Sequence, residues 1–136
     1  MSDSVLNIEL QPGPWPGEAY RKAWPIGGLI RGKVHVEPKE PIRANAVRVE
    51  LGWHTEGRGD EDSDTPTSVT VYEGNLSAAT RTTMNFELNV PETGPITYQG
   101  HYIHILWTVR AVVDIPWKRD LEQEETVEIL PDYDDD

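Results

Sequence analysis

The side chains best suited to catalysis in this 136-residue chain are four histidines and five serines. No serine stands in the Gly-x-Ser-x-Gly turn that exposes a hydrolase nucleophile. His101 and His104 are three residues apart, so on a strand they face opposite sides and cannot hold one metal ion together. His35, His54 and His104 could share a polar face, but single strand histidines are ordinarily surface or hydrogen-bonded residues. The sequence therefore predicts no catalytic residues, no cofactor and no transition-metal site.

The acidic loop GRGDEDSDTP, residues 57–66, offers another kind of metal chemistry. Asp60, Asp62 and Asp64 occupy alternate positions in it. Calcium sites collect about 6–8 oxygen ligands, many of them carboxylates in loops. Runs of like charge more commonly repel one another and remain solvated. We therefore predict a solvated loop and keep calcium binding as an alternative.

A third group of side chains is basic and falls on the predicted outward faces of long alternating strands. Its members are Arg31, Lys33, Arg48 and Arg110. Charge-assisted hydrogen bonds from such residues suit the carboxylates or phosphates of a partner. Acidic neighbours such as Glu50 and Asp114, or the acidic C-terminal residues, could instead neutralise them. These four basic residues are the predicted partner-binding face.

The tryptophans suggest an alternative in a different class, the carbohydrate-binding module. Flat aromatic rings that stay exposed on a β-sandwich can stack on sugars. Trp53 and Trp107 fall on the inward faces of their predicted strands, which makes them core residues. Trp15 and Trp24 lie in the Pro-rich segment 11–28 and are the candidates for exposure, although either could fold back over the core. Sugar binding is therefore kept as an alternative to protein binding.

Charge and composition exclude several classes of function. The formal net charge of −12 argues against general nucleic-acid binding and against adhesion to anionic membranes. The chain has no cysteine, which excludes disulfides and favours a cytoplasmic location. The N-terminal residues lack the basic start and apolar run of a signal peptide. No run approaches about 18 apolar residues, so we expect no transmembrane segment.

Strands are the predicted elements throughout the chain. Eleven prolines and eleven glycines punctuate it, and no helical periodicity is sustained. Alternation predicts strands at residues 5–10, 29–37, 45–54, 68–76, 82–90, 101–115 and 125–130. This pattern is typical of an all-β fold, an antiparallel β-sandwich of seven or more strands. We assign residues 1–130 to a single domain and residues 131–136 to an acidic C-terminal tail, which we expect to be disordered.

The strand at residues 101–115 is predicted to be the centre of the core. Its alternate residues share one apolar face: Ile103, Ile105, Trp107, Val109, Ala111, Val113 and Ile115. About 15 extended residues span about 50 Å, well beyond a usual strand, so we expect a bend or a change of pairing partner along its length. Pro116 ends the strand, and we expect Trp117 to cover the end of the fold.

Several short motifs follow one another in a set order along residues 5–130. They are an internal glycine in a strand at Gly32, the strand end Leu51 to Trp53, the turn Leu88 to Pro91, Tyr98 with Gly100, and Asp114 with Pro116 and Trp117. In their order and spacing the chain resembles the N-terminal domain of the arrestin-like family. That family includes visual arrestins, the arrestin-like subunit of retromer and bacterial sporulation-control proteins. The resemblance implies an arrestin-like, immunoglobulin-like β-sandwich.

The resemblance also implies a function. It points to a non-enzymatic adaptor or scaffold domain that mediates protein–protein interaction. Arrestin-like domains hold acidic or phosphorylated segments on a basic sheet surface, so such segments are the expected partners of the four basic residues. Most family members have two sandwiches and this chain has room for one, so a function that needs the cleft between two sandwiches would require pairing with a second copy or with another chain. Exposed edge strands also make a homodimer an expectation.

Overall fold

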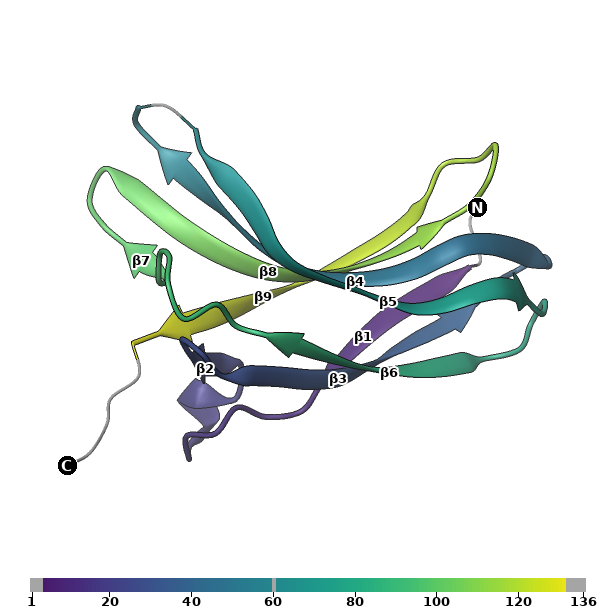
Figure 1. The fold of residues 1–136 in the computed structure, drawn as a ribbon, viewed down its shortest axis with the longest axis horizontal. Helices are drawn as coiled ribbons and strands as arrows, with labels where there is room; N and C mark the ends of the chain where they lie inside the picture. The colour runs from purple at the N-terminus through teal and green to yellow at the C-terminus, as the bar shows by residue number, and fades with distance from the viewer. Residues whose placement is uncertain (1–3, 60, 132–136) are drawn as a thin grey trace.

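The computed structural model describes residues 4–59 and 61–131, and its strands form two packed sheets (Figure 1). The predicted antiparallel β-sandwich of seven or more strands is confirmed, with nine strands in the described part of the chain. Their bounds are β1 (Val5–Leu10), β2 (Ala23–Pro25), β3 (Leu29–Glu37), β4 (Ile42–Gly57), β5 (Ser63–Leu76), β6 (Thr82–Asn89), β7 (Tyr98–Gln99), β8 (Ile103–Asp114) and β9 (Leu121–Leu130). One short 3-10 turn, η1 (Glu18–Tyr20), precedes β2. Across these residues no helix is long and apolar enough to cross a membrane.

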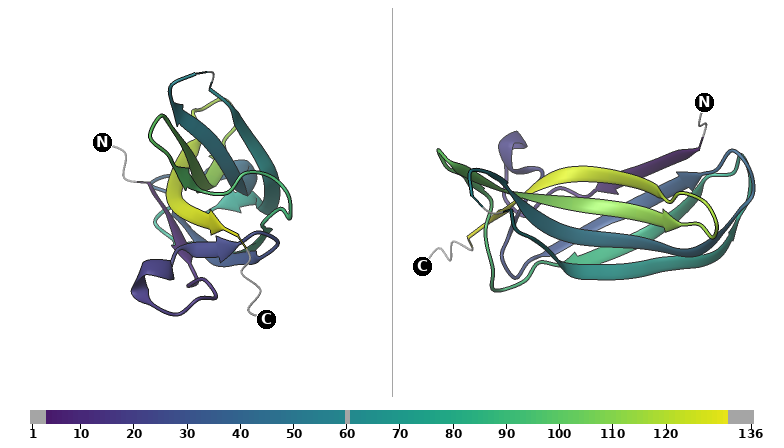
Figure 2. Two further views of the ribbon diagram at one scale, coloured as in Figure 1. Left: turned by 90° about the vertical axis from the view of Figure 1, so that its left-hand side faces the viewer. Right: turned by 90° about the horizontal axis from the view of Figure 1, so that it is seen from above.

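The two sheets differ in size and shape. The small sheet has the order β1-β3-β6, and the large sheet has the order β2-β9-β8-β4-β5 with β7 paired to β8. All pairs are antiparallel except β2 with β9. Figure 1 and the view from above in Figure 2 show that the large sheet bends and that the ends of β4, β5 and β8 extend past the small sheet. The outer surface of the large sheet is consequently concave.

The core lies between the sheets and follows the alternation of the sequence. In β3, Ile30, Val34 and Val36 are fully buried, and Met84, Phe86 and Leu88 of β6 share that interior. Val47, Val49 and Leu51 of β4 face them from the large sheet. Each buried aliphatic side chain contributes about 1.5–3 kcal/mol relative to exposure. The apolar faces read from the sequence therefore supply the packing that holds the two sheets together.

The long strand β8 behaves largely as predicted. Trp107, Val109, Ala111 and Val113 are buried, whereas the inward residues nearest its two ends are only partly buried because the small sheet does not extend over them. The predicted change of partner is present, since β7 pairs with its first residues and β9 with residues 107–113. No register shift interrupts its pairing with β4. The strand is thus continuous on one side and divided between two partners on the other.

Several strand bounds differ from the prediction. β4 and β5 are longer than expected, which reduces the predicted acidic loop at residues 57–66 to the turn between Gly57 and Ser63. Their extension beyond the core is polar, so hydrophobic alternation could not reveal it. Register shifts between β4 and β5, typical of β-bulges, lie at Ala44–Arg48 and Leu51–Trp53. The short strands β2 and β7 were not predicted, because two or three residues carry no periodic signal.

The prediction for Trp117 is wrong, and of the two candidates for exposure Trp24 is buried. Trp117 does not cover the end of the fold: its side chain is fully exposed, and its backbone has φ 63° in the β8–β9 turn. Trp24 is buried rather than exposed, because β2 pairs with the end of β9 and turns its indole into the core. Trp15 is half-buried and packs near Tyr20, at 6.1 Å between ring centroids. The predicted tail at residues 131–136 lies, after Pro131, outside the described residues.

Candidate functional site

The four predicted basic residues do not form one face. Arg31 and Lys33 lie on β3 and point outward from the small sheet, whereas Arg48 and Arg110 lie on β4 and β8 and point outward from the large sheet. The core separates the two pairs. Alternation assigned every one of them correctly to an outward face, but it could not show that those faces belong to opposite sides of the sandwich.

The pair on the small sheet is already matched with acidic neighbours. Arg31 Nε donates to Glu87 Oε2 of β6 at 2.9 Å. Lys33 lies directly opposite Glu9 of β1 in the register. The pKa of the Glu9 carboxyl is lowered first by its hydrogen bond with His35 and, to a smaller extent, by the charge of Lys33. Both sites are solvent-exposed, so these pairings contribute little to stability. This surface therefore has little unbalanced positive charge with which to hold an acidic partner.

The pair on the large sheet belongs to a continuous ion-pair network. Arg110 Nε and Nη2 both donate to Glu50 Oε1, at 3.1 and 2.8 Å, and Arg110 Nη1 lies 3.1 Å from Glu122 Oε1. Arg48 lies 3.7 Å from both Glu50 and Asp114. The hydrogen bond to Glu50 raises the pKa of Arg110 above its ordinary value. Neutralisation by Glu50 and Asp114, the alternative left open by the sequence, is what the structure shows.

The network is held flat against the sheet. Val112 points to the outer face of β8, between Arg48 and Glu122 on the neighbouring strands, yet it is only 2% exposed. Long charged side chains cover apolar surface with their aliphatic stems, which explains how an outward valine becomes buried. The guanidinium and carboxylate groups are therefore positioned by packing below as well as by pairing with one another.

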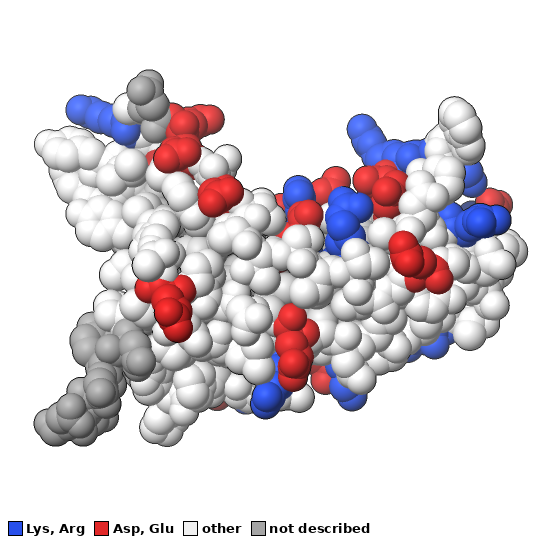
Figure 3. All heavy atoms as spheres, in the orientation of Figure 1, with Lys and Arg blue, Asp and Glu red and all other residues white. Residues whose placement is uncertain are grey.

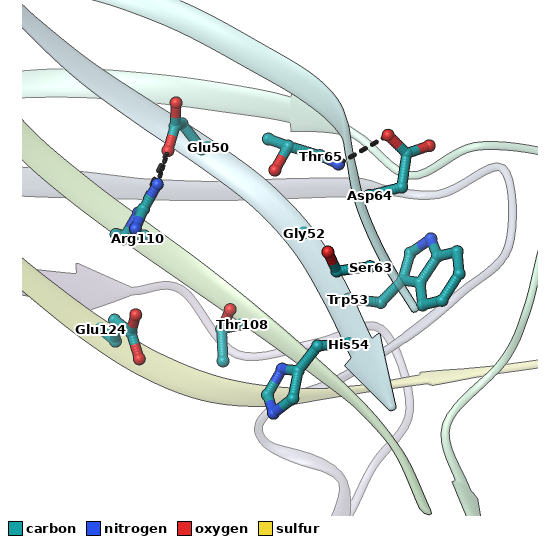
Figure 4. A pocket seen from close by; sticks show the side chains of 10 residues that line it. All are labelled: Glu50, Gly52, Trp53, His54, Ser63, Asp64, Thr65, Thr108, Arg110 and Glu124. Carbon is teal, nitrogen blue, oxygen red and sulfur yellow. Dashed lines mark hydrogen bonds and ion pairs between the residues drawn. The ribbon is translucent and has the colours of Figure 1, made fainter. Parts of the chain in front are cut away.

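A hollow of about 270 Å³ lies next to this network, toward the far end of β4. Figure 4 shows Glu50, Thr108, Arg110 and Glu124 along one part of it, with His54 and Ser63 further along. Gly52 lies on its floor, where an added Cβ would approach the Asp64 carbonyl oxygen to 3.0 Å. In Figure 4 Trp53 and His54 leave opposite sides of β4, in agreement with the packing of Trp53 against the core.

We define the concave face as the outer surface of the large sheet around this hollow. Its charged side chains are Arg48, Glu50, Glu56, Arg110, Asp114, Glu122 and Glu124. These comprise five carboxylates and two guanidinium groups. Figure 3 shows the molecule hollowed along this side, with acidic and basic side chains next to each other on the floor. The concave face is therefore acidic, opposite in sign to the basic face predicted from the sequence.

The residues considered for metal binding are dispersed. His35 bonds to Thr83 and Glu9 on the small sheet, and His54 bonds to Glu56 on the large sheet. In the acidic loop, Asp62 and Asp64 each accept a backbone N–H from the following residue, and Asp60 lies outside the described residues. No group of three or more histidine or acidic side chains within residues 4–59 and 61–131 is arranged to hold a metal ion.

Comparison with known proteins bears on the fold. No protein-family model matches the sequence, and no curated protein is similar to it. Among solved structures, the sporulation control protein Spo0M from Bacillus subtilis matches with a TM-score of 0.75 and 16% sequence identity. The match covers 95% of this chain and 50% of that protein, so the chain spans about half of its length. Spo0M is an arrestin-like bacterial protein, and the chain described here has the arrestin-like fold that its motif order predicted.

Proposed function

We propose that this chain is a non-enzymatic arrestin-like adaptor domain that binds a protein partner through its concave face. The observation that supports it best is the acidic, preorganised surface around Arg110. Arrestin-like folds are generally non-catalytic, which agrees with this class of function. The sheet beneath is fully hydrogen-bonded from β9 through β8 to β4, so it supplies a rigid base for binding.

The charge of the concave face indicates the kind of partner. Glu50 is shared by two arginines, but Glu124, which lines the hollow, has no ion pair with a described residue. A segment with lysine or arginine side chains could pair with it at the rim. Electrostatic complementarity of this kind mainly raises the association rate and selects among partners. We therefore propose a cationic segment as the ligand of this face, in place of the acidic segment expected from the sequence.

Affinity capture tests the proposal. The full chain, immobilised as bait, is compared with Glu122→Lys/Glu124→Lys, which reverses charge beside Arg110. The control is Glu73→Lys, an exposed acid on β5 outside the residues that define the concave face. Partners that use this face should be lost with the double variant, retained with the control and weakened by added salt. Equal recovery on all three baits would show that the concave face is not the binding surface.

A labelled peptide gives a direct measurement. The probe is a peptide of alternating lysine and serine. The comparison peptide has glutamate in place of each lysine. Fluorescence anisotropy should show binding of the lysine peptide to the wild-type chain and reduced binding to Glu122→Lys/Glu124→Lys. Preference of the wild-type chain for the glutamate peptide at this face would support the original expectation of an acidic partner.

A further inference from the structure

A second hollow lies at the opposite end of the large sheet, where the β3–β4 and β8–β9 turns meet. It measures about 280 Å³. Its apolar lining is Pro41, Ile42, Ile115 and Leu121, and its charged residues are Lys39, Glu40, Lys118 and Arg119. Ile42, Ile115 and Leu121 also pack against the core, so the floor of the groove is fixed by the fold. We call this hollow the turn groove. Figure 3 shows several basic side chains at this end of the molecule, with acidic side chains among them.

The turn groove differs from the concave face in that two of its basic groups, Lys118 and Arg119, have no ion-pair partner among the described residues. Lys118 and Arg119 are exposed, and neither forms an ion pair with any residue in the described part of the chain. By contrast, Arg31, Arg48 and Arg110 all pair with carboxylates. An apolar floor with a cationic rim suits a segment that carries a large apolar side chain flanked by carboxylates.

Trp117 supplies an independent indication that this turn makes contact with something. It is fully exposed at φ 63°, a left-handed conformation that costs a residue with a Cβ about 1–2 kcal/mol. Glycine would occupy this turn position without that cost. Strain of this kind is characteristic of ligand contacts and switch regions. A strained, exposed indole beside Lys118 and Arg119 is therefore a candidate anchor.

The chain itself contains a segment with the complementary chemistry. Residues 131–136 read PDYDDD, with Tyr133 between aspartates. In its own molecule this segment cannot reach the turn groove. β9 runs from Leu121, which lines the groove, to Leu130, about 30 Å away at about 3.3 Å per residue. Tyr133 is only three residues beyond Leu130, a reach of about 10 Å. The segment of a second copy has no such restriction.

We infer that the turn groove binds residues 131–136 of a second copy of this chain, with Tyr133 over the apolar floor and its neighbouring aspartates at Lys118 and Arg119. The contact joins two different surfaces, so it is heterologous, and each molecule contributes one groove and one segment. It is separate from the concave face and does not depend on the proposed cationic partner. The overall charge of −12 opposes association, so we expect the contact to be weak and to form only at high protein concentration.

Sedimentation velocity of the full chain between about 10 and 500 µM at physiological salt tests the inference. The wild-type chain should gain mass with concentration. Two variants should remain monomeric: Lys118→Glu/Arg119→Glu, which alters the groove, and Asp132→Asn/Tyr133→Ser/Asp134→Asn, which alters the segment. Mixed together, they should associate, because one retains the segment and the other the groove. Glu122→Lys/Glu124→Lys, on the concave face, is the control and should associate like the wild-type chain or more strongly.

The variant Trp117→Gly separates a binding role from a structural one. It should weaken association about tenfold or more, equivalent to about 1.4 kcal/mol, while the denaturation midpoint stays the same or rises. The inference is overturned if the wild-type chain stays monomeric over the whole concentration range. It is also overturned if association survives in both variants, as association by edge-strand pairing would. A third outcome would also overturn it: self-association is absent, and the chain instead binds anionic phosphatidylserine vesicles in a way that Trp117→Gly abolishes. The turn would then contact lipid.

Discussion

Replacing Glu50 with glutamine tests whether the ion-pair network on the concave face stabilises the fold. Glu50 accepts two hydrogen bonds from Arg110, at 3.1 and 2.8 Å, and lies 3.7 Å from Arg48. Its side chain is 15% exposed, whereas those of Arg110 and Arg48 are 40% and 32% exposed. Glutamine has the same size and keeps one acceptor oxygen. The substitution therefore removes the charge with little effect on packing.

The expected cost follows from these exposures. A hydrogen bond to a charged group contributes about 1.5–3 kcal/mol, and breaking a buried pair costs about 3–5 kcal/mol. Both arginines remain partly hydrated, and Arg110 retains Glu122 as a partner at 3.1 Å. These facts reduce the expected loss toward the range of surface pairs. We expect Glu50→Gln to lower the free energy of unfolding by about 1–2 kcal/mol.

Urea denaturation followed by tryptophan fluorescence measures this loss, and a double-mutant cycle isolates its cause. Arg110→Met and Glu50→Gln/Arg110→Met complete the cycle. A coupling energy of about 1 kcal/mol is expected, with unchanged m-values. Asp114→Asn is a matched control, because among the described residues Asp114 contacts the network through Arg48 alone, at 3.7 Å. A coupling below about 0.3 kcal/mol would show that the network does not stabilise the sheet and would remove the basis for calling the face preorganised.

Three further predictions concern other parts of the fold. Gly32→Ala should lower the free energy of unfolding by about 1–3 kcal/mol in chemical denaturation. The added Cβ would approach Phe86 Cζ to 2.7 Å and the Glu9 carbonyl oxygen to 2.4 Å. A variant as stable as the wild-type chain would contradict the packing of β1, β3 and β6. Val109→Ala, at a fully buried position of β8, should cost about 1–3 kcal/mol by the same assay, and a cost below that of a surface change would refute a central role for this strand. The hydrogen bond from His35 lowers the pKa of Glu9, so its contribution to stability is present above the pKa of an unfolded-state glutamate and is lost as the pH falls through the lowered value. In an NMR titration His35→Gln should raise the pKa of Glu9, and an unmoved midpoint would contradict the assignment.

The sequence by itself determined which residues are extended and which side each one faces. Alternation is a local property of the backbone, so the predictions for Val5–Leu10 and Leu29–Glu37 match the strand bounds of the structure, and the buried face of β8 could be read residue by residue. The order of the short motifs predicted the arrestin-like fold, because the spacing of turns and glycines reflects how strands follow one another. The polar extensions of β4 and β5 could not be seen, since no apolar face marks them.

Only the tertiary structure decided which outward faces lie together. Whether Arg31 and Arg110 share a surface depends on the sheet that each strand joins, and strand pairing is set by contacts between residues far apart in sequence. Register then placed Glu50 opposite Arg110 and made the expected basic face a neutralised network on an acidic surface. The same long-range pairing buried Trp24 under β9, left Trp117 exposed and brought the β3–β4 and β8–β9 turns together as a cationic groove. Periodicity along one strand contains none of this information, because it records the two sides of a strand and not its neighbours.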